Sequence, residues 1–230
     1  MDVLPQSSLF LGVIPALIML YISIKDYESF YKDKVMFLTF VAGIVMGFIA
    51  AFVQSLTIAM VLIYVVLLAF FNQMFKTMVL NIGRLQQNKE TPIYGLSLGL
   101  GFGSSFTPFM IIALSSVSIN NLYVLLTVGI GSFGIILFHG ATGSFIGYGI
   151  FKSKLTKHLL VAILLELPFE ILIGLMIIYS KPEAIRIQAG FASAAVLYGL
   201  IVYLYVYKKV LPNLLTQAEK RKRAKVKTKR

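Results

Sequence analysis

The stretch from Val35 to Leu80 constrains the fold most strongly, because Lys76 is its only charged residue. As a single helix it would be about 70 Å long at a rise of about 1.5 Å per residue, roughly twice the hydrocarbon thickness of a bilayer. It therefore predicts two membrane-spanning helices joined by a tight turn at the polar pair Gln54-Ser55. Charged residues make up only 13 % of the chain, whereas soluble domains contain about 25 %.

Apolar runs of similar length recur along the chain. A helix of about 20 apolar residues crosses a bilayer, and such runs predict seven spans, at about residues 8–25, 35–54, 56–80, 95–117, 121–150, 158–180 and 184–207. The runs lack the alternating polar residues of a membrane β-barrel. We therefore expect an all-α, polytopic membrane helical bundle in residues 1–207, followed by a basic tail in residues 208–230.

The basic residues predict how the bundle is oriented. Lysines and arginines collect on the cytoplasmic side of membrane proteins. With seven spans, all 21 of them except Lys181 and Arg186 belong to that side, which predicts an N-terminus outside and a C-terminus in the cytoplasm. No basic residue precedes the first span and no small-residue cleavage site follows it, so we expect an uncleaved span rather than a signal peptide. The predicted location is an integral, multi-pass membrane protein, in the plasma membrane if the source is prokaryotic.

Glycines recur four residues apart inside the predicted spans. Small residues at this spacing allow two helix backbones to approach closely in lipid. We interpret them as packing positions within the bundle, with a homo-oligomer interface as the alternative. The positions are Gly43 with Gly47, Gly95 with Gly99 and Gly103, and Gly143 with Gly147.

Ionisable side chains inside a span are costly and usually mark a functional site. The spans contain Lys76, His139, Glu166 and Glu170, with Asn72 and Gln73 as neutral companions. Counted from the cytoplasmic ends of their helices, His139, Glu166, Glu170 and Asn72 lie at depths of about 12–18 Å. This depth predicts that they meet in the cytoplasmic half of the bundle. His158, beside Lys157 at the start of a span, is instead expected at the membrane interface.

Glu166 and Glu170 are four residues apart and therefore share a helix face. Two carboxylates this close in a low dielectric are not expected to be ionised together, which suits a general acid–base pair or a shared proton. Hydrogen bonding to a neighbouring helix is the structural alternative, and snorkelling is the alternative for Lys76. With His139 the two carboxylates form a set that zinc accepts, but no compact metal motif is present. The sequence therefore leaves metal and cofactors open. The absence of cysteine excludes thiolate catalysis and iron–sulfur clusters.

Three stretches resemble motifs of the PrsW-like intramembrane proteases, a group related to the CAAX prenyl proteases and the Aph subunit of γ-secretase. They run from Phe70 to Lys76, from Gly95 to Phe106, and from Leu137 to Gly149. Their order, their spacing and the predicted seven spans fit the family over about residues 60–180. The resemblance implies a seven-helix membrane fold around an intramembrane active site.

The acidic centre of the family motif is replaced in this chain. The family's first motif has two glutamates followed three residues later by Lys or Arg; here Asn72-Gln73 replaces the pair and Lys76 remains. The second motif has an acid or a His four residues after a Phe; Phe102 matches, and Phe106 stands at the functional position.

Of the remaining two motifs, the third matches the family pattern and the fourth departs from it. The third contributes a His, matched by His139, and the fourth reads His, three residues, Asn, where Glu166 and Glu170 stand. Neutral amides at Asn72 and Gln73 cannot accept the proton of an attacking water. The resemblance therefore implies a catalytically degenerate member, a membrane scaffold or client-binding subunit.

Two other functions remain open at this point. One is an active intramembrane peptidase that uses Glu166, Glu170 and His139. The other is a small proton- or cation-coupled transporter that uses the same two carboxylates.

The tail from Lys208 to Arg230 is basic, with Glu219 as its only acid. Such a tail anchors the topology and attracts anionic lipid, and docking to ribosomal RNA is the functional alternative. The expected partners are therefore the lipid bilayer, anionic lipid or ribosomal RNA at the tail, and membrane-protein clients or further subunits.

Overall fold

The computed structural model describes residues 4–57, 61–86, 88–113, 122–179 and 182–215, and this part of the chain is helical without any strand. The helices are α1 (Leu4–Ile24), α2 (Asp33–Thr57), α3 (Val61–Leu80), α4 (Thr91–Ser104), α5 (Phe106–Ala113), α6 (Leu122–Phe151), α7 (Leu155–Ile178) and α8 (Ile185–Tyr205). Short helical turns cover Glu28–Phe30, Pro182–Ala184, Val206–Val210 and Leu211–Leu214. The predicted all-α class is confirmed.

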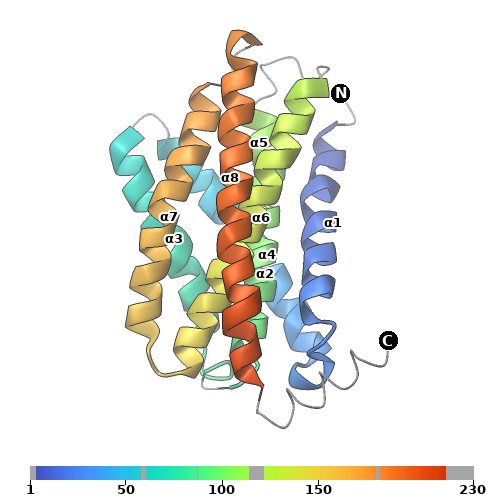
Figure 1. The fold of residues 1–230 in the computed structure, drawn as a ribbon, viewed down its shortest axis with the longest axis vertical. Helices are drawn as coiled ribbons and strands as arrows, with labels where there is room; N and C mark the ends of the chain where they lie inside the picture. Colours follow the sequence, from blue (N-terminus) through green and yellow to red (C-terminus); the bar gives the residue numbers. More distant parts are fainter. Residues whose placement is uncertain (1–3, 58–60, 87, 114–121, 180–181, 216–230) are drawn as a thin grey trace.

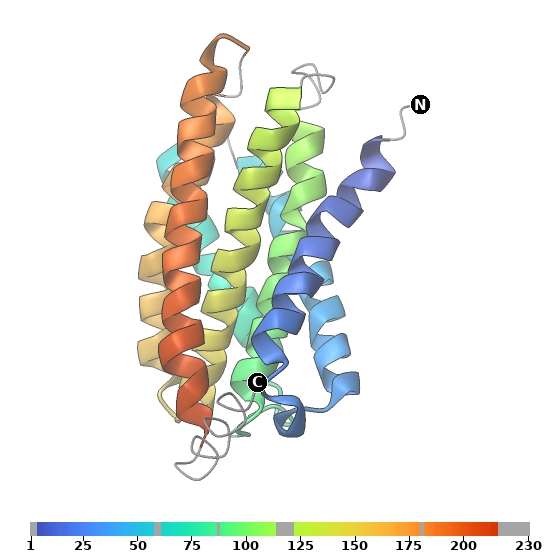
Figure 2. The same ribbon diagram turned by 45° about the vertical axis from the view of Figure 1, so that its right-hand side comes forward.

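The helices run along the long axis of one elongated bundle (Figures 1 and 2). In Figure 1, α1 begins at the upper end and α8 finishes at the lower end. Four stretches are long and apolar enough to cross a membrane: Asp33–Gln54, Leu126–Phe151, Leu155–Ile178 and Ile185–Leu214. Shorter apolar stretches lie at Phe10–Ile24 and Val65–Leu80. These helices indicate a membrane protein.

Large apolar side chains also cover the outside of the bundle. Phe37 on α2, Leu164 on α7 and Ile201 on α8 are each more than 60 % exposed. A water-soluble protein rarely exposes apolar patches of this extent, whereas lipid is a favourable solvent for them. The outer surface therefore fits the same environment as the lengths of the helices.

Helix α4 is the centre of the bundle, and all 14 of its residues are buried. It packs most extensively against α6 and α2, and α1 and α3 also contact it. Lipid therefore reaches no side of α4. Its neighbours α3 and α6, together with α7, which packs against both of them, carry the polar residues that the sequence singles out.

Two predicted boundaries are wrong. The turn expected at Gln54-Ser55 is absent, because α2 continues through this pair to Thr57. Gln54 is buried inside the bundle, so its polarity does not mark a surface turn. The expected span 95–117 is also interrupted, since α4 ends at Ser104 and α5 begins at Phe106. Pro108 lacks the N–H that would bond the carbonyl of Ser104 in a continuous helix.

Candidate functional site

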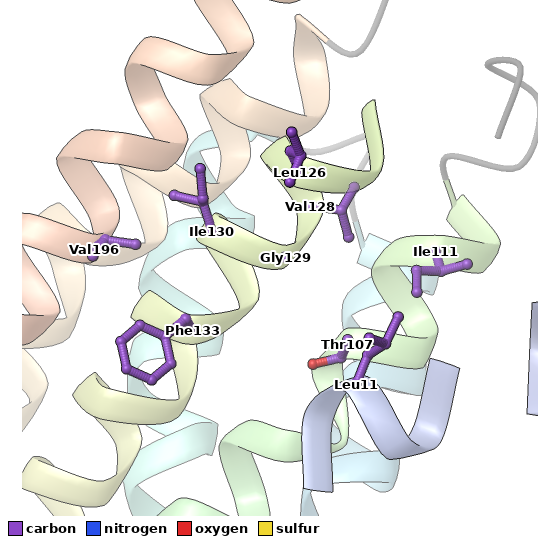
Figure 3. Close-up of a pocket in the computed structure, with 9 residues that line it drawn as sticks. All are labelled: Leu11, Thr107, Ile111, Leu126, Val128, Gly129, Ile130, Phe133 and Val196. Atoms are coloured by element: carbon purple, nitrogen blue, oxygen red, sulfur yellow. The ribbon is translucent and has the colours of Figure 1, made fainter. Parts of the chain in front are cut away.

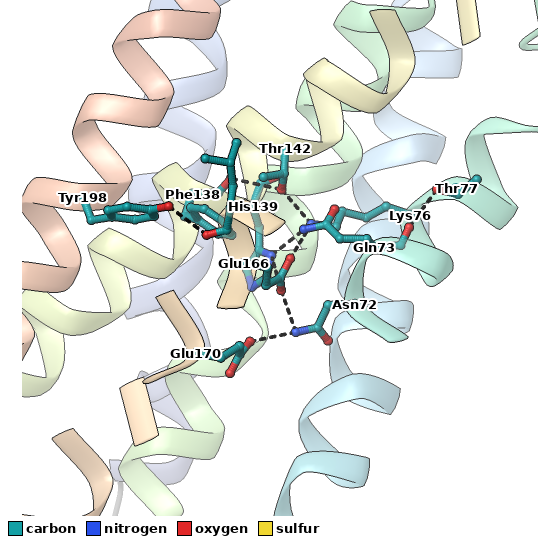
Figure 4. A network of polar contacts seen from close by, with 11 residues as sticks. Asn72, Gln73, Lys76, Thr77, Phe138, His139, Thr142, Glu166, Glu170 and Tyr198 are labelled. Carbon is teal, nitrogen blue, oxygen red and sulfur yellow. Dashed lines mark hydrogen bonds and ion pairs between the residues drawn. The ribbon is translucent and has the colours of Figure 1, made fainter. Parts of the chain in front are cut away.

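Helices α3, α6 and α7 bring their buried polar residues into one group, which we call the polar cluster. It consists of Asn72, Lys76, His139, Thr142, Glu166 and Glu170 (Figure 4). Each side chain is at most 3 % exposed. The residues that the sequence predicted to meet therefore do meet. They are packed against one another in the interior of the bundle.

Asn72 connects α3 to α7. Its side-chain nitrogen donates one hydrogen bond to Glu166 Oε1 at 2.8 Å and another to Glu170 Oε1 at 2.9 Å. An amide nitrogen has two hydrogens, so both are used on the two carboxylates. The one-turn spacing of Glu166 and Glu170 lets a single amide reach both of them.

Lys76 lies one turn further along α3 and connects it to α6. Its ammonium nitrogen donates to Thr142 Oγ1 at 2.7 Å, lies 3.1 Å from His139 Nδ1, and stands 4.0 Å from Glu166 Oε2. An ammonium group has three donors and no acceptor. His139 Nδ1 must therefore accept from a charged Lys76, and the imidazole is then neutral with its hydrogen on Nε2. Glu166 is the acidic partner of Lys76 in this contact.

Aromatic rings enclose His139. The ring of Phe102 lies edge-on at 4.8 Å between centroids, and that of Phe106 stacks at 5.4 Å. The ammonium of Lys76 also lies over the Phe102 ring, 5.3 Å from its centre, within the range of a cation–π contact. Phe106 therefore contributes an apolar wall to the imidazole.

Gln73 differs from its neighbour Asn72. Its side chain is fully buried, and neither its oxygen nor its nitrogen has a hydrogen-bond partner among the described residues. Its backbone carbonyl accepts from the Thr77 hydroxyl at 2.8 Å. The Asn72-Gln73 pair is thus split, since only Asn72 bonds to the carboxylates. One oxygen of Glu166 and one of Glu170 likewise have no hydrogen-bond partner.

The described residues contain no group of three or more His, Asp or Glu side chains arranged to hold a metal ion. His139 Nδ1 and Glu166 Oε1 are 3.8 Å apart, and the ammonium of Lys76 lies beside both residues. The basic side chain of Lys76 therefore already lies beside the two groups that a bridging metal would bind. This donor set does not fit the zinc ion that the sequence left open.

Most of the predicted packing glycines lie where α4 meets α6, whereas Gly43 and Gly47 lie where α2 meets α4. A Cβ on Gly95 would overlap the carbonyl oxygen of Gly143, and one on Gly99 would overlap that of His139. Gly103 lies against Ile136, and Gly147 against the backbone of Thr91. The partners run in opposite directions along the two helices, so α4 and α6 are antiparallel. This close approach carries Phe102 to the imidazole of His139.

Two apolar cavities open on the sides of the bundle. One of about 530 Å³ lies between α1, α5, α6 and α8, and Figure 3 shows the residues that line it. A second, of about 340 Å³, lies between α6, α7 and α8, and Thr142 is among its lining residues. Thr142 therefore separates this cavity from Lys76.

The sequence assigned Thr142 no role, although the residue bonds Lys76 directly. It stands three positions after His139 on α6, on the next turn of the same helix. That spacing is a usable signal, because side chains at i and i+3 share a face. His158 is half-buried near the start of α7, and its Nδ1 lies 2.8 Å from the Lys154 carbonyl oxygen.

Comparison with known proteins gives no match: no family model fits the chain, and neither a curated protein nor a solved structure is significantly similar to it.

Proposed function

We propose that this protein is a PrsW-like multi-pass membrane protein that has lost catalysis and acts as a scaffold or client-binding subunit. The observation that carries the proposal is the pair of hydrogen bonds from Asn72 to Glu166 and Glu170. The resemblance places a glutamate at position 72. Here the residue donates hydrogen bonds to carboxylates, and its side chain cannot take a proton from water.

The closure of the polar cluster supports the same proposal. Its members are buried and directly bonded to one another. A hydrolase must bring water and a scissile carbonyl to within hydrogen-bond reach of its base. Lys76 and Asn72 instead join α3 to α6 and α7, which is the task of a structural cluster.

The apolar cavity between α1, α5, α6 and α8 supports a client-binding role. Leu126 and Ile130 at its edge are about half exposed. Inside a bilayer, two helices associate through close packing rather than through a hydrophobic driving force. A hollow in the side of the bundle can contact more of the surface of a partner's transmembrane helix than a flat face can.

The proposal includes a membrane topology. Seven spans, with α4 and α5 together forming the fourth, place the N-terminus outside and the C-terminus in the cytoplasm. The asymmetry of Lys and Arg supports this orientation. The basic tail then lies at the cytoplasmic surface, where anionic lipid attracts it and ribosomal RNA is the other polyanion within reach.

A reconstituted system tests the proposal. Liposomes would contain the purified protein and a single-span peptide whose cleavage releases a fluorophore. We expect wild type, Glu166→Gln and Glu170→Gln all to release fluorophore at the rate of empty liposomes. A photo-cross-linking residue at Leu126 should capture the peptide, and the same residue at Leu164, exposed on α7 away from the cavity, should not.

The opposite outcomes would identify a different function. Cleavage by wild type that disappears in Glu166→Gln would establish the peptidase. Proton uptake that disappears in the same variant would establish the transporter. Equal cross-linking at Leu126 and Leu164 would contradict the proposal that the client peptide binds at this cavity.

The peptidase is the second candidate function, and one observation favours it. Within the described part of the chain, Glu166 Oε2 and Glu170 Oε2 have no hydrogen-bond partner, and Glu166 lies 3.8 Å from the imidazole of His139. Two carboxylates and a neutral histidine are the groups that acid–base hydrolysis uses. In that case the acids would have moved from α3 to α7.

A further inference from the structure

A third cavity, of about 660 Å³, lies at the lower end of the bundle, between the first turns of α2 and the last turns of α3. Its lining is divided by chemistry. Val35, Leu38 and Val79 provide apolar walls, and Lys32 and Arg84 stand at the end that leaves the bundle. An apolar slot with cations at one end matches a phospholipid, whose acyl chains end in a phosphate.

The structure fixes the backbone under both cations. The backbone N–H of Lys32 donates to the hydroxyl of Tyr94 at 3.0 Å, and Tyr94 is buried in the fixed helix α4. The backbone carbonyl of Arg84 accepts from the side chain of Asn88 at 2.9 Å. The two basic side chains therefore start from held positions on opposite sides of the cavity. Both hydrogen bonds involve backbone atoms of Lys32 and Arg84, so substitution of the two charged side chains leaves them in place.

The charges also select the class of headgroup. Lys32 and Arg84 face one acid in the lining, Glu90, so the cavity carries a net positive charge. A phospholipid with a net negative charge balances it, whereas a zwitterionic lipid leaves it unbalanced. Leu38 and Ile82, both lining residues, are 54 % and 55 % exposed. They continue the apolar wall onto the outer surface, where acyl chains lie.

We propose that this cavity binds one anionic phospholipid, with its phosphate at Lys32 and Arg84 and its acyl chains along α2 and α3. The site shares no lining residue with the polar cluster, and it does not depend on whether the protein is an enzyme. A lipid bound between the start of α2 and the end of α3 would therefore be part of the folded bundle.

The absence of tryptophan gives a direct test. A single tryptophan introduced as Leu38→Trp would report on the cavity through quenching by phospholipids with brominated acyl chains. The matched control is Leu160→Trp, which is equally exposed and stands five residues into α7 as Leu38 stands five residues into α2. In full-length protein we expect phosphatidylglycerol to be preferred over phosphatidylcholine about fivefold at Leu38→Trp and not at Leu160→Trp.

Charge variants separate this site from the general attraction of the basic tail. Lys32→Gln with Arg84→Gln should abolish the preference at Leu38→Trp, and Glu90→Gln should increase it. Lys152→Gln with Lys154→Gln, which removes two charges outside the cavity, should leave it intact. A preference that survives Lys32→Gln with Arg84→Gln would overturn the proposal. So would an equal preference at Leu160→Trp, or equal quenching by brominated phosphatidylethanolamine.

Discussion

Lys76 is the residue whose burial demands the most compensation, since an unpaired charge in the interior costs several kcal/mol. It receives a hydroxyl, a ring nitrogen and a carboxylate, each from a different turn of α6 or α7. The arrangement explains why Lys76 does not snorkel to the interface. The same contacts bind α3 to the rest of the bundle.

A double-mutant cycle measures this connection. Lys76→Met leaves Glu166 buried without a counter-charge and should destabilise the protein by about 3–5 kcal/mol. Adding Glu166→Gln removes the stranded charge, so the combined loss should be smaller than the sum by about 0.5–3 kcal/mol. Unfolding in detergent provides the measurement.

The control for this cycle is an exposed pair at distant positions. Lys152→Met and Glu183→Gln should add within about 0.5 kcal/mol, because the two positions lie beyond opposite ends of α7. If the losses at Lys76 and Glu166 were also additive, the two residues would not form an ion pair.

Part of the polar cluster was predictable from sequence and part was not. Counting residues from the helix ends gives the depths of His139, Glu166 and Glu170, and depth alone predicts that they meet. It does not give the rotation of each helix about its axis. For that reason neither the hydrogen bonds of Asn72 nor the isolation of Gln73 could be predicted. The contact of Phe106 with His139 depends in addition on how closely α4 approaches α6.

At the scale of helices, the contact between α4 and α6 positions the cluster. Gly95, Gly99 and Gly103 remove side-chain bulk from one face of α4, so that its backbone rests on the backbone of α6. Backbone contact at this distance also brings the rings of Phe102 and Phe106 to His139. The enclosure of His139 by aromatic rings therefore depends on the close approach that the glycines of α4 allow.

Adding one methyl group tests this contact. Gly99→Ala would push a Cβ into the carbonyl oxygen of His139 and should destabilise the protein by about 1–3 kcal/mol. Gly190→Ala on α8 is the control, because a Cβ there meets nothing within 4 Å and alanine favours a helix by up to about 1 kcal/mol. Thermal unfolding of the two variants gives the comparison. Equal stability would mean that α4 and α6 are not in backbone contact.

The break between α4 and α5 shows why helix boundaries were harder to predict than helices. Every residue from Phe106 to Ala113 is apolar except Thr107, so hydropathy continues across the break. The interruption comes from Pro108 and from the Ser105 hydroxyl, which donates to the carbonyl of Ile44 on α2 at 2.8 Å. A bond to another helix leaves no trace in the hydropathy of its own segment.

At the scale of the whole molecule, the apolar outer surface and the positions of the basic residues both fit a helical bundle in a bilayer. Apolar side chains cover the length of α1, α2, α7 and α8. Lys32, Lys34, Arg84 and Lys152 lie near the lower end of the bundle in Figure 1, at the starts of α2 and α7 and the end of α3. These are the features that a charge-oriented membrane bundle requires.

Cysteine labelling tests the orientation, since the chain has no cysteine of its own. Two exposed positions are suitable. Lys34→Cys lies in the first turn of α2, and Glu183→Cys lies just before α8. A membrane-impermeant maleimide should label Glu183→Cys in intact cells and Lys34→Cys only after permeabilisation. Labelling of both from the same side would contradict the seven-span topology.

The approximate positions of the long helices along the chain were predictable because lipid imposes a length on each apolar run. The described helices begin within about five residues of the predicted spans. The turn expected at Gln54-Ser55 and the break between α4 and α5 were the two exceptions. Gln54 is buried and α2 continues past it, and sequence alone could not distinguish a polar residue facing a neighbouring helix from one facing water.

The complete burial of α4 has a consequence for biosynthesis. Its glycine face offers little apolar area, so lipid alone is a poor environment for this segment as it leaves the ribosome. The helices that cover it are made on either side of it in time, α2 earlier and α6 later. Until α6 is synthesised, the growing chain holds an unfinished core, and any translocation machinery or chaperone must shelter α4 for that interval.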